Sequence, residues 1–171
     1  MTSLILKNTG RFVFLVLFQV LILNHIQFSG FINPLFYIYF ILLLPYNTPR
    51  WAMLSSAFLL GLSIDLFVNT PGLNAAASVL IAFARPFVIR SISTGTEYEV
   101  GDAPSLKNQG IKWFGYYSLI LVLVHHTALF YLEIFRFTGF FYTLFRVLVS
   151  SAFTLLLVFL AEFLFYHREK V

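Results

Sequence analysis

The chain has 171 residues, of which 60% are hydrophobic and only 11% are charged, and phenylalanine alone occurs 22 times. A soluble domain carries about 25% charged residues, so this composition predicts an integral membrane protein. Cysteine is absent, which excludes disulfides, thiolate metal ligands and a cysteine nucleophile. The net charge of +4 comes from basic residues scattered between apolar runs, which does not favour nucleic acid as a partner.

An apolar run at residues 12–28 is the first predicted span. At about 1.5 Å per residue it crosses most of a ~30 Å hydrocarbon core. The alternative is a signal peptide, but the run is long for one. The polar stretch Asn24-His25-Ile26-Gln27 also lacks the small residues of a cleavage site. We therefore expect an uncleaved first span.

Residues 31–46 form the second predicted span. Asn33 and Pro34 are typical of a helix start, and Pro45 and Pro49 bracket its end. A helix between these prolines is too short to cross a membrane unaided, so a re-entrant segment or a helix continuing through residue 46 are both open. Its aromatic residues are candidate partner surfaces, with ordinary lipid contact as the alternative: Phe36, Tyr37, Tyr39 and Phe40.

The distribution of basic residues decides whether this segment crosses. If it does, nearly all of them fall on the side of the N-terminus, namely Lys7, Arg11, Arg50, Arg85, Arg90, Lys107, Lys112, Arg168 and Lys170. If it does not, most of them face outward. Because basic residues concentrate in cytoplasmic loops, we predict an all-α integral membrane protein: a single domain of six transmembrane helices over residues 1–171, with both termini cytoplasmic.

The next two predicted spans, residues 51–68 and 72–89, occupy the centre of the chain. Gly61 and Asp65 share one face of the first, because residues four apart lie on the same side of a helix. A lipid-facing charge costs about 2.5–3.5 kcal/mol on insertion scales, so Asp65 is expected to face protein or water. The second span contains small residues that allow close helix approach, namely Ala75, Ala76, Ala77, Ser78, Ala82 and Ala84. We predict a close antiparallel pair with the small faces together.

The turn between these two spans is polar. Thr70 is the expected N-cap of the second span and Pro71 its first helical residue, with Gly72 beside them. Arg85 lies near the opposite membrane surface from Asp65, so the two are not expected to pair. We expect Arg85 to extend to that surface while its aliphatic stem stays in the apolar region.

Residues 91–112 are the one long polar stretch, interpreted as a flexible cytoplasmic loop that is either a docking site or a plain connector. The fifth and sixth predicted spans follow at residues 113–132 and 140–165. Adjacent helical residues point about 100° apart, so His125 and His126 are expected to be buried hydrogen-bonding groups and not a metal site. Arg146 needs a partner in the membrane, and either Asp65 or Glu133 is the expected one.

The central stretch resembles the family of the rod shape-determining membrane protein MreD. The resemblance lies in Gly61-x-x-x-Asp65, the short turn with Pro71-Gly72 and the Ala/Ser-rich helix that follows. Asn33-Pro34 before an aromatic-aliphatic run, the chain length and the number of spans also fit, so the resemblance extends over most of the chain. The polar stretch 91–112 departs from the family pattern, which has a shorter connection there.

This resemblance implies a fold similar to the six-helix substrate-binding subunits of energy-coupling-factor transporters. It also implies a non-enzymatic scaffold of the cell-elongation complex in a bacterial cytoplasmic (inner) membrane. The partners implied are membrane lipid, an MreC-type bitopic protein, a RodA-type synthase with its transpeptidase and, indirectly, an MreB-type filament. Structural or partner roles are expected for Gly61, Asp65, Thr70, Pro71, Gly72, Glu133 and Arg146.

The motif content agrees with a protein that is not an enzyme. The sequence has no Gly-x-Ser-x-Gly elbow, no His-Glu-x-x-His and no phosphate-binding glycine loop. No catalytic, cofactor-binding or metal-binding residue is therefore predicted. The alternative function is a solute-binding membrane subunit of a transporter that takes a vitamin-type ligand. Its weakness is that the outer loops are short and the polar groups few, whereas ligand pockets need several convergent polar contacts.

Overall fold

The computed structural model describes residues 2–26, 32–93, 102–134 and 139–168, and within these ranges the chain is all-α. Its elements, in order, are α1 (Thr2–Leu21), η1 (Leu23–His25), η2 (Phe36–Ile38), α2 (Tyr39–Leu42), α3 (Arg50–Val68), α4 (Leu73–Ile92), α5 (Leu106–Ile134) and α6 (Phe140–Arg168). The elements η1 and η2 are single turns of 3₁₀ helix.

Five helices are long and apolar enough to cross a membrane: Leu6–His25, Arg50–Val68, Leu73–Ile92, Leu106–Ile134 and Phe140–Leu164. The outer surface differs from that of a soluble protein, because large apolar side chains such as Phe141 and Leu66 are mostly exposed, whereas polar residues such as Gln19 and Thr154 are fully buried. The core is otherwise apolar. An apolar outer surface, with polar side chains facing protein, is what a lipid environment requires. The chain is therefore a multi-pass membrane protein, and these five predicted spans are confirmed.

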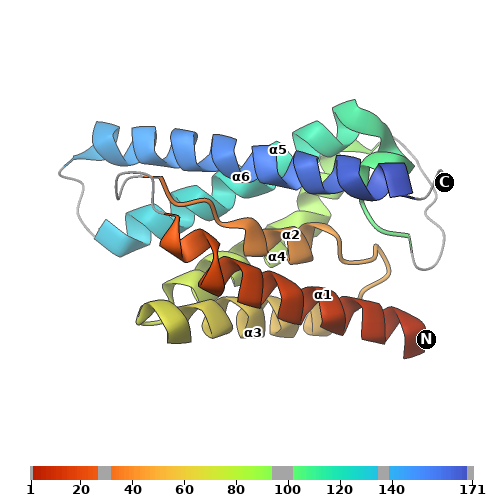
Figure 1. Ribbon diagram of the computed structural model, residues 1–171. Helices are drawn as coiled ribbons and strands as arrows, with labels where there is room; N and C mark the ends of the chain where they lie inside the picture. The colour runs from red at the N-terminus through yellow and green to blue at the C-terminus, as the bar shows by residue number, and fades with distance from the viewer. Residues whose placement is uncertain (1, 27–31, 94–101, 135–138, 169–171) are drawn as a thin grey trace.

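The long helices pack in chain order from α3 to α6, and α1 packs on α3. The first residues of α1 and the last residues of α6 lie at the same end of the bundle (Figure 1). The turn between α3 and α4 lies at the other end. Between α1 and α6 runs the short segment that contains η2 and α2, which fills the space these two helices leave (Figure 1).

The second predicted span, residues 31–46, is not a long helix, and this corrects the expectation of six long helical spans. From residue 32 the segment is extended, then forms η2 and α2, and ends at Pro45. Prolines at both ends limit it to about two helical turns, which is too short for a lipid-facing span. It nevertheless runs through the bundle from the end where α1 stops to the end where α3 begins (Figure 1).

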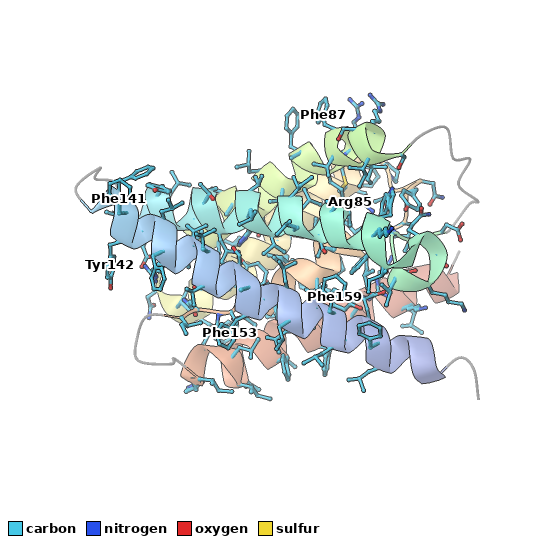
Figure 2. All side chains as sticks on the ribbon, turned by 90° about the horizontal axis from the view of Figure 1, so that it is seen from above. Arg85, Phe87, Phe141, Tyr142, Phe153 and Phe159 are labelled. Atoms are coloured by element: carbon cyan, nitrogen blue, oxygen red, sulfur yellow. The ribbon has the colours of Figure 1, made fainter. Side chains whose placement is uncertain are left out.

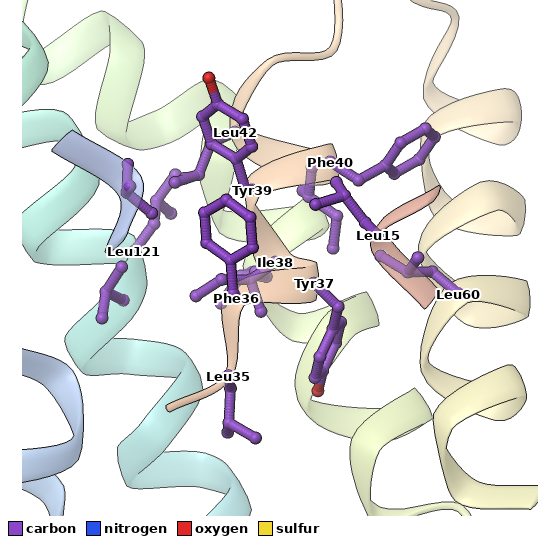
Figure 3. Packing of buried hydrophobic residues seen from close by; sticks show 14 of the residues in the cluster. Leu15, Leu35, Phe36, Tyr37, Ile38, Tyr39, Phe40, Leu42, Leu60 and Leu121 are labelled. Carbon is purple, nitrogen blue, oxygen red and sulfur yellow. The ribbon is translucent and has the colours of Figure 1, made fainter. Parts of the chain in front are cut away.

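This central segment, residues 32–45, is the core of the bundle. Every side chain from Leu35 to Leu44 is at most 7% exposed. Figure 3 shows these side chains extending toward Leu121 of α5 on one side and toward Leu15 of α1 and Leu60 of α3 on the other. The expectation that Phe36, Tyr37, Tyr39 and Phe40 form a partner surface is therefore wrong. They are buried between helices, because the segment has protein on all sides.

The predicted polar loop at 91–112 is shorter than expected. Helix α4 continues to Ile92, and α5 already begins at Leu106. At Gly110 the backbone has a φ of 77°, a region that favours glycine, and this kink separates a first turn from the long part of α5. Residues 94–101 lie outside the described residues, so the docking interpretation of that part stays a prediction.

Candidate functional site

Gly61 marks the closest approach of α3 and α4. A Cβ atom placed on it would lie 2.4 Å from the Cα of Ala75 and 2.4 Å from the carbonyl oxygen of Asn74. No side chain fits there, so glycine is required for the two backbones to pack this tightly. Ala57 and Ala82 are also fully buried. The predicted close antiparallel pair with its small faces together is confirmed.

Asp65, one turn further along α3, holds the N-terminus of α4. It is 2% exposed and faces protein, as predicted. Its Oδ1 accepts the backbone N–H of Asn74 at 3.1 Å, and its Oδ2 accepts that of Ala75 at 2.9 Å. The Asn74 side chain donates at 3.0 Å, and the Thr70 hydroxyl donates as well. These N–H groups have no partner within their own helix, so the carboxylate caps α4 from outside and is favoured by the helix dipole.

The predicted cap of α4 was therefore wrong in detail. Thr70 is not the N-cap: its hydroxyl is turned to Asp65. Pro71 is not the first helical residue either, because α4 begins at Leu73. Gly72 occupies the cap position with a φ of 84°, where a side chain would be strained. A cap supplied from nine residues earlier is not visible in the local sequence pattern.

Arg146 pairs with Glu133, one of the two partners expected for it. The guanidinium Nη1 lies 2.9 Å from Glu133 Oε2 and the guanidinium carbon 4.2 Å from the centre of the Phe130 ring. Asp65 is engaged by α4 and is not the partner. The Glu133 side chain is 44% exposed, so this ion pair lies at the rim of the bundle and not in its interior.

A second set of polar residues binds the backbone in the first half of the central segment. The sequence analysis did not identify these residues. Gln19 of α1 donates to the carbonyl of Pro34 at 3.0 Å and accepts the N–H groups of Phe36 and Tyr37 at 2.8 and 3.3 Å. From α6, Thr154 accepts the N–H of Leu35 at 3.0 Å. Non-helical backbone has unpaired donors and acceptors, which are tolerated at membrane depth only when protein satisfies them.

The second half of the central segment is held in the same way. Arg11 donates to the carbonyl of Leu43 at 3.2 Å. Tyr117 of α5 donates to the carbonyl of Leu42 at 2.8 Å. Arg85 of α4 donates to the carbonyl of Leu44 and, through Nε, to the Tyr117 hydroxyl at 2.8 Å. Arg85 is 2% exposed, so the expectation that it extends to the membrane surface is wrong: the free carbonyls at the end of α2 hold it inside.

Glu162 of α6 joins three parts of the chain. It accepts the hydroxyl proton of Tyr39 at 2.6 Å and the backbone N–H of Leu106 at 2.7 Å. The first contact fixes α2 against α6, and the second caps the N-terminus of α5. This buried carboxylate, like Asp65, is therefore satisfied by hydrogen-bond donors and a helix terminus.

Tyr37 connects the central segment to α4 through Asn74 and to α5 through His125. Asp65 only accepts, so the amide nitrogen of Asn74 faces it and the Asn74 oxygen faces Tyr37, which donates at 3.0 Å. His125 Nε2, 2.9 Å from the Tyr37 hydroxyl, must then be the donor, which assigns its tautomer and leaves Nδ1 buried without a partner. His126 binds the carbonyl of Val122 through Nδ1 at 3.0 Å. Both are buried hydrogen-bonding groups, as predicted.

This arrangement constrains the chemistry of the interior. The buried polar side chains described above bind backbone groups or one another. Among the described residues no three His, Asp or Glu side chains come together as metal ligands. The polar residues that bind the central segment could have been identified from one sequence pattern. They lie within otherwise apolar spans, and the chain also contains a segment between two prolines that is too short to cross a membrane alone. The members of the set are Arg11, Gln19, Arg85, Tyr117, Thr154, Glu162 and also Ser150, whose hydroxyl accepts the backbone N–H of Asn33 at 3.2 Å.

The chain was compared with known proteins at the level of sequence families, curated proteins and solved structures. No family model matches it, and neither the curated proteins nor the solved structures give a match.

Proposed function

We propose that this chain is a non-enzymatic scaffold of the bacterial cytoplasmic membrane, of the MreD type, which supports cell shape and peptidoglycan synthesis. In this proposal it spans the membrane an even number of times with both termini cytoplasmic. Its helices pack against MreC-type and RodA-type partners, and through them it is linked to a transpeptidase and an MreB-type filament.

One observation carries the proposal: the buried ionisable side chains are occupied in holding the fold together. Asp65 caps α4, Glu162 caps α5, and Arg85 binds the carbonyl of Leu44 in the central segment. Groups used in this way are not free to act as a general base or to bind a solute. The outer surface of the bundle is then the part available for function, which is the position expected for a scaffold.

The motif on which the resemblance depends also supports the proposal. Gly61 and Asp65 act together, since the glycine brings α4 close and the carboxylate then caps it. A motif that sets the geometry of one helix pair suits a protein whose outer faces must present a fixed shape to partner helices. The proposed membrane topology is further supported by the start of α1 and the end of α6, which lie at the same end of the bundle (Figure 1).

Co-purification tests the proposal. The tagged full chain is extracted from its host in mild detergent, and the proteins that elute with it are identified by mass spectrometry. MreC-type and RodA-type proteins should be recovered, and depletion of the chain should round the cells. An ATPase module with its coupling protein, or a stoichiometric small ligand, would instead establish the solute-binding subunit and overturn the scaffold.

The matched variant for this experiment is Asp65→Asn. It removes the charge that caps α4 while keeping the size of the side chain. Glu133→Gln is its control, because it neutralises an acid at the rim of the bundle. The scaffold proposal expects the first to weaken recovery of partners and the second to leave it unchanged.

A further inference from the structure

A cleft lies between α3 and α4 at the end of the bundle where α3 begins. Seven side chains line it: Arg50, Met53, Leu54, Phe83, Pro86, Phe87 and Arg90. It is separate from the buried network around Asp65, which lies at the other end of the same two helices. Figure 2 shows Phe87 directed away from the bundle, whereas Arg85, two residues earlier, is directed inward.

Within the described ranges of the chain, the two arginines have no counter-charge. Arg50 is the first residue of α3, where the helix dipole is positive and a basic side chain is unfavourable. Arg90 lies in the last turn of α4, directly across the antiparallel pair. Both are exposed, and neither has an ion-pair partner among the described residues. The N–H groups of the first turn of α3 add to the positive field, so this end of the cleft attracts an anion.

The remainder of the cleft is apolar and open to the side. Phe83 and Phe87 are 59% and 55% exposed, and their ring centres lie 5.4 Å apart along one wall. Leu54 and Met53 form the other wall. Trp51, beside Arg50, is 73% exposed, and exposed tryptophans in membrane proteins lie at the level of the lipid headgroups. The arginines are thus at headgroup depth and the aromatic wall extends toward the acyl chains.

We propose that this cleft binds one anionic phospholipid, with its phosphate between Arg50 and Arg90 and an acyl chain along Phe83 and Phe87. A free phosphate would bind the arginines but would leave the apolar walls without contacts. An acidic peptide has no acyl chain to fill the part of the cleft that faces lipid. By the positive-inside rule this end of the bundle is cytoplasmic, where the leaflet is anionic. Bound lipid would fix α3 and α4 at the end opposite to the Asp65 cap.

Native mass spectrometry of the full chain, titrated with phosphatidylglycerol or phosphatidylcholine in detergent, tests the proposal. The wild type should bind one phosphatidylglycerol in preference to phosphatidylcholine. In R50Q/R90Q this preference should fall about 25-fold, at roughly fivefold for each of the two interfacial charges removed. The control K7Q/K112Q removes the same charge from exposed positions outside the cleft and should keep the preference. R50K/R90K should retain most of it.

A second variant tests the apolar walls of the cleft. It also keeps the proposal testable if R50Q/R90Q fails to fold. Leu54→Trp keeps both arginines and fills the cleft, so phosphatidylglycerol binding should fall while the elution profile stays that of the wild type. Millimolar inorganic phosphate should not displace the lipid. Equal loss in R50Q/R90Q and K7Q/K112Q, unchanged binding in Leu54→Trp, or displacement by phosphate would each overturn the proposal.

Discussion

The side-chain oxygen of Gln19 accepts the backbone N–H of Phe36 at 2.8 Å. It thus takes the place that a backbone carbonyl has in a regular helix. The same side chain also binds the backbone of Pro34 and Tyr37. One glutamine thus satisfies three backbone groups that have no partner within a helix or strand. It is the most concentrated example of how polar side chains allow non-helical chain to run inside this bundle.

Gln19→Leu is therefore expected to be strongly destabilising although leucine is the more apolar residue. Each buried group left without a partner costs about 1–3 kcal/mol, so the loss should be at least about 3 kcal/mol. The melting temperature in detergent measures the loss, and hydrogen exchange should show lost protection at Phe36 and Tyr37. Gln109→Leu, at a half-buried position in the first turn of α5, is the control and should change little.

Gly61→Ala should push α3 and α4 apart. Alanine is the better helix former by about 1 kcal/mol, but its Cβ would overlap the backbone of Asn74 and Ala75. Overpacking of this kind costs about 1–3 kcal/mol, so a net loss of stability is expected. Gly115→Ala is the matched control, because its nearest neighbour would be a Phe159 ring atom at 3.8 Å. A melting temperature raised by both substitutions would contradict the close approach.

Asp65→Asn should destabilise the bundle by about 1.5–3 kcal/mol, the usual worth of hydrogen bonds to a charged group. The asparagine NH₂ would face a donor, either Ala75 N–H or the groups that bind Oδ1. Glu133→Gln breaks an ion pair at the rim and should cost no more than about 1 kcal/mol. Chemical unfolding of both variants in mixed micelles compares them. Equal losses would mean that Asp65 is not the cap of α4.

Tyr117→Phe removes one hydroxyl with two partners. The carbonyl of Leu42 loses its donor, and Arg85 Nε loses its acceptor. A loss of about 2–4 kcal/mol is expected, because both groups are buried. Tyr116→Phe is the neighbouring control: its ring is 64% exposed on the outside of α5, and little change is expected. Thermal unfolding followed by circular dichroism distinguishes the two, and equal stability of both variants would contradict the role of Tyr117.

Much of the fold could be predicted from the sequence, because five spans are set by long apolar runs that need no tertiary information. The Gly61 approach was also predictable, since small residues at four-residue spacing indicate a packed helix face. The central segment was not. Its prolines indicate only that a long helix cannot form, and whether such a segment lies in lipid or in protein depends on polar residues that lie from 15 to 123 positions away.

The candidate site was predictable where partners are close in sequence and not elsewhere. Arg146 and Glu133 lie on consecutive helices, and the pair was one of two expected. Arg85 was predicted to extend to the membrane surface because only its position near the end of its span was considered. Its actual position follows from the carbonyl of Leu44, which precedes it by 41 positions, and hydropathy carries no information on that contact.

The hydrogen bonds between the central segment and α6 have a consequence for biogenesis. Leu35 and Thr154 are separated by 119 residues, and Tyr39 and Glu162 by 123. The ribosome makes α6 long after residues 32–45 have left the exit tunnel. Until α6 is made, the Leu35 amide and the Tyr39 hydroxyl lack these two partners, so water or an insertase has to satisfy them.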